Sequence, residues 1–215
     1  MATRPKTKQP TAPLNKSKRL PPDVRKAQIL DSAARLVVEQ GYLPLPMEQL
    51  ARAAGASKAL IYAYYPTQYA LFNALLGREL RSLAVAGMDT AARVDDLEQA
   101  AVLSAMIYFE HVARSGPLVH ILMTDLYLAD HIDRELADAL DAFVQQLTRI
   151  AARSLPLGEQ EIFAALEMVA AIPEESGRLV FHHELDHASA RQICRELIVS
   201  SLKALRAPDQ VLVPD

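Results

Sequence analysis

Apolar residues recur along this chain mainly at spacings of three and four, which is the period of an α-helix. No stretch shows the apolar–polar alternation of a β-strand, and no segment repeats another. We therefore predict an all-α fold of about nine helices. Their expected ranges are 22–40, 47–54, 58–64, 67–86, 95–114, 118–128, 133–154, 159–181 and 188–206.

Glycine and proline mark several boundaries between these helices. Gly41 and Gly55 follow apolar runs, and a glycine just past a helix end favours the left-handed stop. Pro173 lies inside the eighth predicted helix, which it should kink or interrupt. The helix at 95–114 is apolar nearly all round, which predicts a place in the middle of a bundle.

Residues 47–72 combine two short helical patterns around a glycine. Leu50 and Ala54 share one face of the first pattern, and Gly55 ends it. Ser57 can cap the second pattern, because its hydroxyl can accept from a backbone N–H one turn later. A helix, a glycine-containing turn and a second helix form the motif whose second helix enters the DNA major groove.

The second short helix places unusual side chains outward. Ile61 should face the core, which leaves Lys58, Leu60, Tyr62 and Tyr64 largely exposed. A face that only meets water would carry Glu, Lys and Gln. A cation and phenol hydroxyls suit phosphates and base edges, so we predict that this helix contacts DNA.

The residues in and before this motif follow a known pattern. They are Ala51, Ala54, Gly55, Ala56, Ser57, Ile61, Tyr62, Tyr64, Tyr65, Pro66 and Leu71, with Ile29, Leu30, Ala33, Ala34, Leu36, Gly41 and Tyr42 upstream. Together they resemble the DNA-binding signature of the TetR-type transcriptional regulators. The resemblance covers about residues 23–83, and the rest of the chain is only generically similar.

Four positions depart from the usual residues of that family. Ala59 stands in place of glycine, and Tyr65 stands in place of phenylalanine, so its hydroxyl needs water or a partner. Gln68 replaces a lysine that would be expected to contact a phosphate. Pro46 replaces a Ser or Thr cap. The first helix of the motif, at 47–54, should therefore be started by proline, whose fixed φ is close to that of a helix.

The motif and the resemblance together imply a division of the chain. We expect a disordered basic arm over 1–22, a helix-turn-helix domain over 23–83, a ligand-binding and dimerisation domain over 84–206, and a tail over 207–215. The predicted DNA-binding residues are Ser57, Lys58, Ala59, Leu60, Tyr62, Tyr64, Tyr65 and Thr67, with Lys18 and Arg19 of the arm.

The charge distribution supports this division. Residues 1–80 carry 12 Lys and Arg against 5 Asp and Glu, a net charge of +7, whereas residues 81–215 carry 11 against 21, a net charge of −10. A basic N-terminal part on an acidic remainder is typical of a nucleic-acid reader that has a second function elsewhere. Basic tails also occur for solubility alone.

Cysteine content and hydropathy indicate a cytoplasmic protein. Cys194 is the single cysteine, so no internal disulfide can form. No apolar run approaches the roughly 18 residues of a membrane span, and the charged N-terminus has no apolar segment behind it. We therefore expect neither a membrane partner nor a secretory signal.

The resemblance implies that the last two helices pair with those of a second copy. The predicted dimer-interface residues are Ile162, Leu166, Val169, Leu197, Ile198, Ser201, Leu202 and Leu205. The wide apolar stripe of the last helix and its small residues fit close helix packing. The same stripe also fits ordinary packing within one subunit.

A pocket for a small-molecule effector is implied in the same domain. The predicted lining residues are Met106, Phe109, His120, Met123, Tyr127 and Phe143, with His120 as the polar contact. Methionine and aromatic side chains adapt to apolar ligands, so the effector should be largely apolar. These residues also fit a plain core.

Other chemistry finds little support in the sequence. His183 and His187 lie four residues apart, as two metal ligands on a helix would, but a loop is expected there. A solvated histidine corner that includes His182 is therefore favoured, and no metal is predicted. No phosphate-binding glycine loop, nucleophile elbow or His-Glu-x-x-His motif occurs, so we expect no enzyme and no cofactor.

These observations converge on a ligand-responsive transcriptional regulator, which we expect to be a homodimeric repressor released from a palindromic DNA operator by its effector. The alternative is a helical protein that carries a small molecule or lipid and has a degenerate helix-turn-helix; Gln68 is its one argument. An activator would use the same residues. Salt-dependent binding of operator-like DNA separates a regulator from a carrier.

Overall fold

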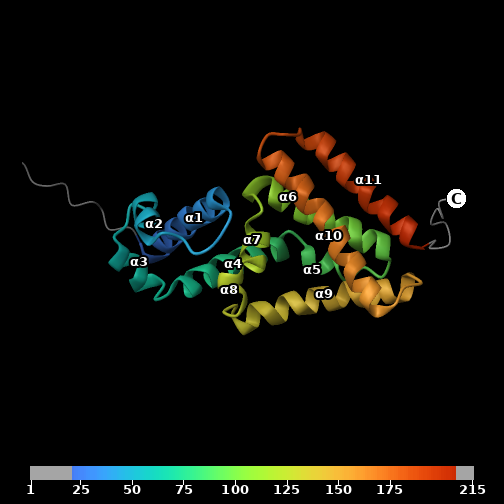
Figure 1. Cartoon of the computed structure of the whole chain (residues 1–215), viewed down its shortest axis with the longest axis horizontal. Helices are drawn as coiled ribbons and strands as arrows, with labels where there is room; N and C mark the ends of the chain where they lie inside the picture. Colours follow the sequence, from blue (N-terminus) through green and yellow to red (C-terminus); the bar gives the residue numbers. More distant parts are fainter. Residues whose placement is uncertain (1–20, 207–215) are drawn as a thin grey trace, which may run out of the picture.

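The computed structural model describes residues 21–206, and this part of the chain is all-α, with no strand (Figure 1). Its eleven helices are α1 (Pro22–Gln40), α2 (Met47–Ala53), α3 (Lys58–Tyr64), α4 (Gln68–Val85), α5 (Met88–Ala91), α6 (Leu97–Ser115), α7 (Leu118–Thr124), α8 (Leu126–Ala129), α9 (Arg134–Ser154), α10 (Glu159–Phe181) and α11 (His187–Arg206). The predicted fold class is confirmed, although the helix count is slightly higher.

Local chemistry sets several helix ends where the sequence predicts them. Gly41 ends α1 at a φ of 80°, in the left-handed region that favours glycine. The Ser57 hydroxyl accepts from the N–H of Leu60 at 3.1 Å, and the Thr67 hydroxyl accepts from the N–H of Ala70 at 3.0 Å. These two caps satisfy N–H groups that have no partner inside α3 and α4.

Three predicted elements need correction. The segment 118–128 forms two helices, because the carboxylate of Asp125 accepts from the N–H of Tyr127 and starts α8. A short helix, α5, follows α4 where no element was predicted. Pro173 does not interrupt α10, which continues through it from Glu159 to Phe181.

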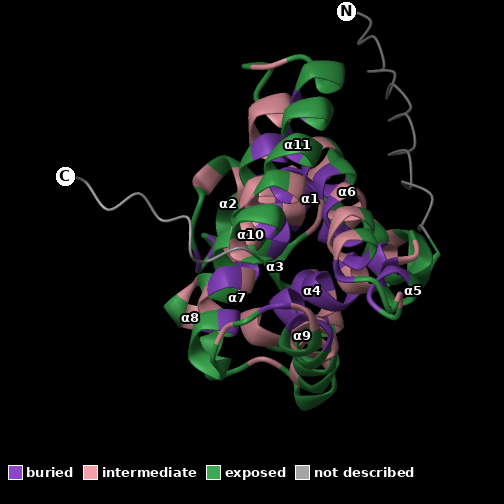
Figure 2. Ribbon diagram, turned by 90° about the vertical axis from the view of Figure 1, so that its right-hand side faces the viewer, coloured by how far each residue is buried: buried purple, intermediate pink, exposed green. Residues whose placement is uncertain are grey.

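The helices form a reading head and a larger bundle, joined by α4. Figure 1 shows α1–α3 at one end, α10 and α11 at the other, and α4 running between them. Helix α6 lies in the middle of the bundle, where it packs against α10 and α11, as its all-round apolar pattern predicts. Helix α9 is more exposed, with only Ile150 and Ala151 buried in it (Figure 2).

The hydrophobic core crosses from the head into the bundle. Leu50, Ile61 and Phe72 of the head belong to one buried cluster with Leu118 and Leu122 of α7. Because these side chains are buried in one cluster, the head and α7 share one core.

Candidate nucleic-acid interface and effector region

Helix α3 is held in place by one buried side chain and a tight turn. Ile61 is completely buried in the head core, so it fixes which face of α3 points outward. Gly55 in the turn before α3 has a φ of 55°, which L-residues with side chains rarely adopt. The geometry of this turn sets the angle at which α3 leaves α2.

The outward face of α3 carries most of the predicted DNA-binding residues. Ser57, Lys58 and Ala59 are exposed at its N-terminal end, and Tyr62 is 41% exposed one turn later. Thr67 is exposed at the start of α4. Leu60 and Tyr64 are half-buried, and Tyr64 packs against the head core. Lys18 and Arg19 lie outside the described residues.

Tyr65 does not lie on this surface, which corrects its inclusion among the DNA-binding residues. Its side chain is 7% exposed and belongs to the head core, and burial raises the pKa of its hydroxyl. Gln68 has a structural role, because its amide oxygen accepts from the N–H of Leu45 at 3.1 Å. The residue in place of the expected lysine therefore ties the α1–α2 connector to α4.

Two charged residues that sequence reasoning missed lie beside α3. Glu48 of α2 forms an ion pair with Lys58, which raises the pKa of Lys58 and lowers that of Glu48, chiefly through the hydrogen bond between them. Arg25 of α1 approaches the carbonyl of Gly55 at 3.5 Å. Arg25 therefore adds a cation near the α3 N-terminus, whereas Glu48 competes with DNA phosphates for Lys58.

The six predicted pocket residues do not gather around one cavity. Phe109 is fully buried against Ala190 and Cys194, while His120 and Met123 are exposed. Tyr127 and Phe143 pack against the head core cluster, and Met106 is half-buried between two clusters in the bundle. Helical periodicity predicts which side chains turn inward, but it does not predict which helices they meet.

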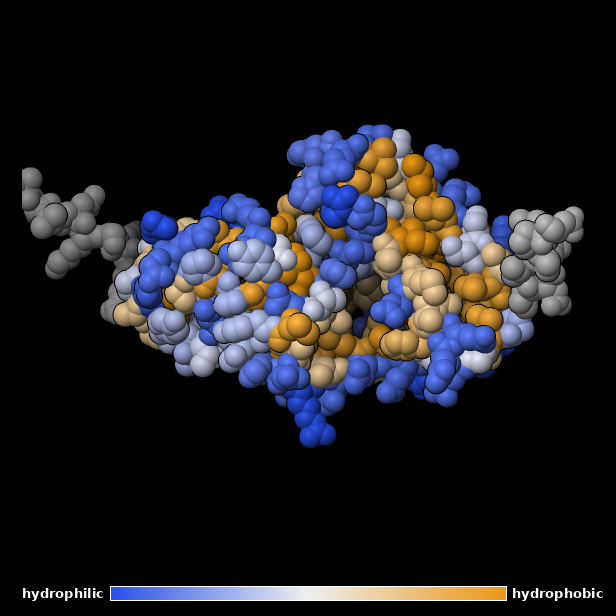
Figure 3. Space-filling view, viewed as in Figure 1, coloured by the Kyte–Doolittle hydropathy of each residue, from blue (hydrophilic) through white to orange (hydrophobic). Residues whose placement is uncertain are grey.

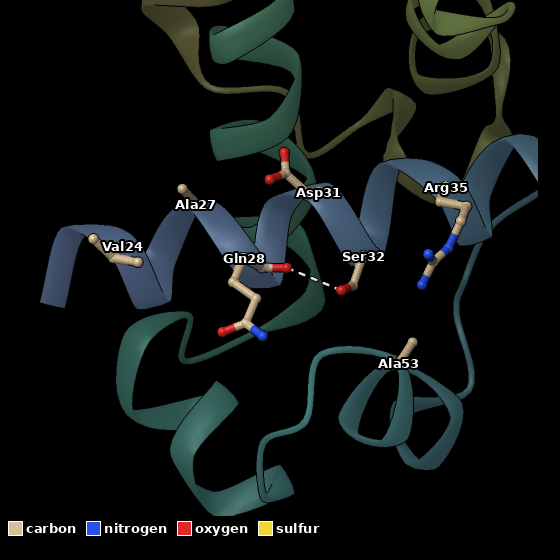
Figure 4. A pocket seen from close by; sticks show the side chains of 7 residues that line it. All are labelled: Val24, Ala27, Gln28, Asp31, Ser32, Arg35 and Ala53. Carbon is tan, nitrogen blue, oxygen red and sulfur yellow. Dashed lines mark hydrogen bonds between the residues drawn. The ribbon is translucent and has the colours of Figure 1, made fainter. Parts of the chain in front are cut away.

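Two grooves are formed by other residues. A groove of 440 Å³ lies along α1 beside the end of α2, and its lining is Val24, Ala27, Gln28, Asp31, Ser32, Arg35 and Ala53 (Figure 4). A groove of 320 Å³ lies where α4 ends beside α6 and α11. It is lined by Leu83, Ala86, Leu103, Met106, Ile107, Glu110, His111, Arg114 and Arg191. Met106 is the only predicted pocket residue in either lining.

Buried polar groups concentrate on one face of α6. Ser104 and His111 are 6% and 2% exposed, and neither the Ser104 hydroxyl nor either ring nitrogen of His111 has a hydrogen-bond partner within the described residues. Tyr108, between them, donates to the carboxylate of Glu174 on α10. Burial lowers the pKa of His111, with Glu79 at 3.4 Å opposing that shift, and burial raises the pKa of Glu174.

The predicted dimer-interface residues divide between the interior and the surface. Ile162, Ile198 and Leu202 are almost completely buried inside the subunit, so their assignment to the interface is corrected. Leu166, Val169, Ser201 and Leu205 are half-buried, and Leu197 is 49% exposed. Exposed apolar side chains that the sequence analysis did not select are Phe163, Met168 and Ile193.

These exposed side chains make α10 and α11 apolar on the outside. Figure 3 shows hydrophobic surface gathered over both helices. A contiguous exposed apolar surface on a folded chain is typical of an interaction site. The apolar stripes of α10 and α11 are wide, so the sequence alone could not distinguish the residues that face α6 from those that face outward.

The histidine corner joins two helices of the bundle. His182 follows the end of α10, and His183 has a φ of 60°, so His183 and His187 do not share one helix. The ring of His187 lies 2.8 Å from the carboxylate of Glu110 on α6. Within residues 21–206, no group of three or more His, Cys, Asp and Glu side chains is arranged to hold a metal ion.

Two polar side chains, Asp125 and Asn73, make three hydrogen bonds between the head and the bundle. The Asp125 carboxylate, which caps α8 with one oxygen, accepts with the other from the N–H of Leu43 in the α1–α2 connector at 2.8 Å. The Asn73 side chain on α4 donates to the carbonyl of His131 at 2.7 Å and accepts from the N–H of Asp133 at 2.8 Å. These contacts and the shared core make a joint around α4.

The head and bundle define a class of protein. A glycine-turned helix pair whose second helix exposes a cation and a tyrosine, followed by a helical bundle, is the architecture of a helix-turn-helix DNA-binding protein. Residues 29–75 match the family model described as "Bacterial regulatory proteins, tetR family". This segment of the chain, which contains α2 and α3, is therefore similar to that family.

The chain is also similar to curated proteins named as HTH-type transcriptional regulators. The chain is 31% identical over 116 residues to the HTH-type transcriptional activator FasR of Mycolicibacterium smegmatis, and the match covers 52% of each protein. It is 40% identical over 73 residues to the HTH-type transcriptional regulator BetI of Rhizobium meliloti, over 32% of this chain and 36% of BetI. The matched region therefore spans about half the length of these relatives, or less.

Solved structures share the fold across most of the chain. A TetR-like transcriptional regulator from Rhodococcus sp. RHA1 has a TM-score of 0.64 at 20% identity, over 86% of this chain and 99% of that one. The regulator FadR from Bacillus subtilis, solved in complex with stearoyl-CoA, has a TM-score of 0.60 at 18% identity, over 81% and 98%. None of the helices between residues 21 and 206 has the length and apolarity to cross a membrane.

Proposed function

We propose that this protein is a DNA-binding transcriptional regulator that responds to a small-molecule effector. The observation that carries the proposal is the outward face of α3, where Lys58 and Tyr62 stand exposed on a helix fixed by the buried Ile61. The family match over residues 29–75 includes this helix.

The proposed DNA contacts follow from the exposure of each residue. Lys58 neutralises a phosphate once it leaves Glu48, and Tyr62 lies where a base edge or phosphate can reach its hydroxyl. Ser57 and Thr67, the exposed N-cap residues of α3 and α4, are further candidates for phosphate contacts. Lys18 and Arg19, in the predicted basic arm, add affinity along the phosphate backbone without adding sequence information.

We propose that two copies bind one operator. Helix-turn-helix proteins read paired half-sites, which requires two recognition helices about 34–36 Å apart. The exposed apolar side chains of α10 and α11 support pairing through these helices, with Phe163, Met168, Ile193 and Leu197 at the contact. The division into a head over 23–83 and a sensing and dimerisation domain over 84–206 is part of this proposal.

An effector would act through the joint around α4. This helix begins in the head and ends at the bundle groove, so a ligand that favours one position of α4 changes the separation of the two α3 helices. The structure of FadR with stearoyl-CoA supports small-molecule sensing on this fold. We propose that the effector releases the protein from DNA, so that the protein acts as a repressor. The relative FasR is named as an activator, which is the opposite direction of regulation.

The relatives are regulators rather than enzymes, and we propose no catalytic activity and a cytoplasmic location for this chain. The alternative function is a carrier of small molecules whose head no longer binds DNA. Gln68 was the argument for this carrier, because it stands where a lysine is expected. Its hydrogen bond to the N–H of Leu45 gives it a structural role, which weakens that argument.

Selection from a random library of DNA duplexes tests the proposal. The full chain should enrich a palindrome whose half-sites lie one helical turn, or a multiple of it, apart. Binding to that duplex should weaken steeply with salt, because phosphate contacts release counterions. A chain that enriches no sequence, and binds no duplex at low salt, would be the carrier.

A further inference from the structure

The interior of the bundle contains polar groups that the protein itself does not satisfy. The buried side-chain nitrogen and oxygen atoms without a partner in the described residues are Ser104 Oγ, His111 Nδ1 and Nε2, and Glu174 Oε1. Leaving such groups unpaired costs free energy, so their concentration at one place calls for an explanation.

The residues concerned belong to one site. Ser104, Tyr108 and His111 lie at positions i, i+4 and i+7 of α6, which places them on one helical face. The rings of Tyr108 and His111 lie 6.5 Å apart at an angle of 10°. Glu174 joins this face from α10, because one of its carboxylate oxygens accepts from the Tyr108 hydroxyl.

The charges at this site are unbalanced. Among residues 21–206, Glu174 forms no ion pair with a lysine or arginine, whereas Glu79 at the other end of the face is paired with Arg78 at 2.8 Å. A charge on His120 of α7 favours the ionised form of Glu174. His120 itself is exposed and therefore well solvated. Glu174 thus presents one free acceptor oxygen, and no lysine or arginine within residues 21–206 is paired with it.

The surface of the bundle is hollowed on one face. Figure 3 shows a hollow in the molecular surface between α7 and α10, above α9. Hydrophobic and weakly polar side chains border much of this hollow. A molecule that enters this hollow would therefore meet a largely apolar rim.

We propose that the effector is an amphipathic amine, whose ammonium head donates to Glu174 and whose aliphatic body occupies the apolar surroundings. This inference rests on the proposed function, because it names the chemical class of the effector. An ammonium supplies both the missing charge and the missing donor, and the Ser104 hydroxyl, one turn from Tyr108, can accept a second N–H. A carboxylate of the same size would meet the charge of Glu174 instead and be repelled.

Two matched series of compounds test this proposal. Straight-chain alkylammonium ions of four to twelve carbons and carboxylates of equal length are titrated into the full chain by calorimetry, in the absence of DNA. At least one alkylammonium ion should bind, and the carboxylate of the same length should bind at least about ten times more weakly, the usual scale for a hydrogen bond to a charged group. Equal or tighter binding of the carboxylate would overturn the proposal, as would no binding across the ammonium series, which would mean that water alone satisfies these atoms.

Variants locate the binding site. Glu174→Gln keeps the shape and removes the charge, so alkylammonium affinity should fall about ten-fold or more. Glu167→Gln is the matched control, because Glu167 lies on the same helix and is exposed. If Glu174→Gln fails to fold, Ser104→Ala serves instead, with an expected loss of several-fold. Undiminished affinity in a folded variant would contradict the site.

The readout separates this inference from the function on which it rests. Calorimetry without DNA reports ligand binding alone, so the alkylammonium and carboxylate titrations decide the class of ligand by themselves. A chain that binds the amine but selects no duplex would overturn the proposed regulator, and the ligand class would still be correct. A chain that selects a duplex but binds only carboxylates would overturn the ligand class and leave the regulator standing.

Discussion

The reading head and the bundle place their polar groups in opposite ways. In the head, Lys58 and Tyr62 stand on the surface, and Ile61 on the same short helix is completely buried. In the bundle, Ser104 and His111 turn polar atoms into the interior without satisfying them. A surface that meets a large polyanion needs exposed donors, whereas a site for a small molecule needs buried groups that its ligand completes.

The largest expected effect concerns the core that the two regions share. Phe72→Ala removes a completely buried ring from the cluster that joins the head to α7. We expect it to lower the free energy of unfolding by about 3–5 kcal/mol, as for other buried aromatic truncations. Urea unfolding measures the change, with Tyr62→Ala as a surface control. A loss below about 1 kcal/mol would show that the shared core is not rigid.

The bundle depends on a close approach between two helices. A Cβ atom at Gly177 of α10 would lie 2.6 Å from the Val112 Cβ and 3.0 Å from the Phe109 carbonyl oxygen of α6. Gly177→Ala should therefore force the helices apart and cost about 1–3 kcal/mol of stability. Thermal unfolding checks this against Gly158→Ala, where the nearest atom is a flexible side-chain oxygen at 3.4 Å. Equal shifts in both variants would contradict the packing.

The joint between the regions offers a smaller test. The two carboxylate oxygens of Asp125 accept from the N–H groups of Leu43 and Tyr127. Asp125→Asn replaces one of these oxygens by an NH2 group, so the N–H of Leu43 or of Tyr127 loses its acceptor. We expect a loss of about 1 kcal/mol in stability and weaker coupling between effector and DNA binding. Asp130→Asn, at an exposed position nearby, is the control. Unchanged stability and coupling in Asp125→Asn would exclude this contact from the joint.

The smallest expected effect is a pH dependence. Burial lowers the pKa of His111 below its ordinary 6.5, with Glu79 opposing the shift and Arg114 adding to it. The stability contributed by neutral His111 is then present above pH 6.5 and is lost as the pH falls through the lowered value. His111→Leu should therefore lose less stability than the wild type between pH 7 and 5, measured by urea unfolding. An equal loss in both would show that the imidazole does not titrate in this window.

The comparison also explains what the sequence could predict. The head follows local signals: Gly55 breaks α2 and Ser57 caps α3, so the exposed position of Lys58 was predictable. Tyr65 was misplaced because its burial depends on neighbouring helices rather than on the family pattern. In the bundle, the wide stripes of α10 and α11 predicted helices correctly, but not that Ile198 faces inward while Ile193 faces out.

The polar interior left a weaker sequence signal. Ser104, Tyr108 and His111 recur at helical spacing within an apolar run, which could have marked one polar face of α6. Their partner Glu174 lies 66 residues beyond Tyr108, and only the packing of α10 on α6 brings the two together. Contacts of this kind depend on tertiary structure, so the hydrophobic period alone cannot predict them.

The most direct test of the central claim is the salt dependence of binding to the selected duplex by Lys58→Ala and by Lys203→Ala. Both variants remove one exposed lysine charge, the first from α3 and the second from the last turn of α11. If α3 reads DNA, Lys58→Ala should weaken binding and reduce the slope of log K against log salt by about one unit, while Lys203→Ala leaves both unchanged. Identical slopes in the wild type and Lys58→Ala, with undiminished affinity, would contradict the assignment of α3 as the recognition helix.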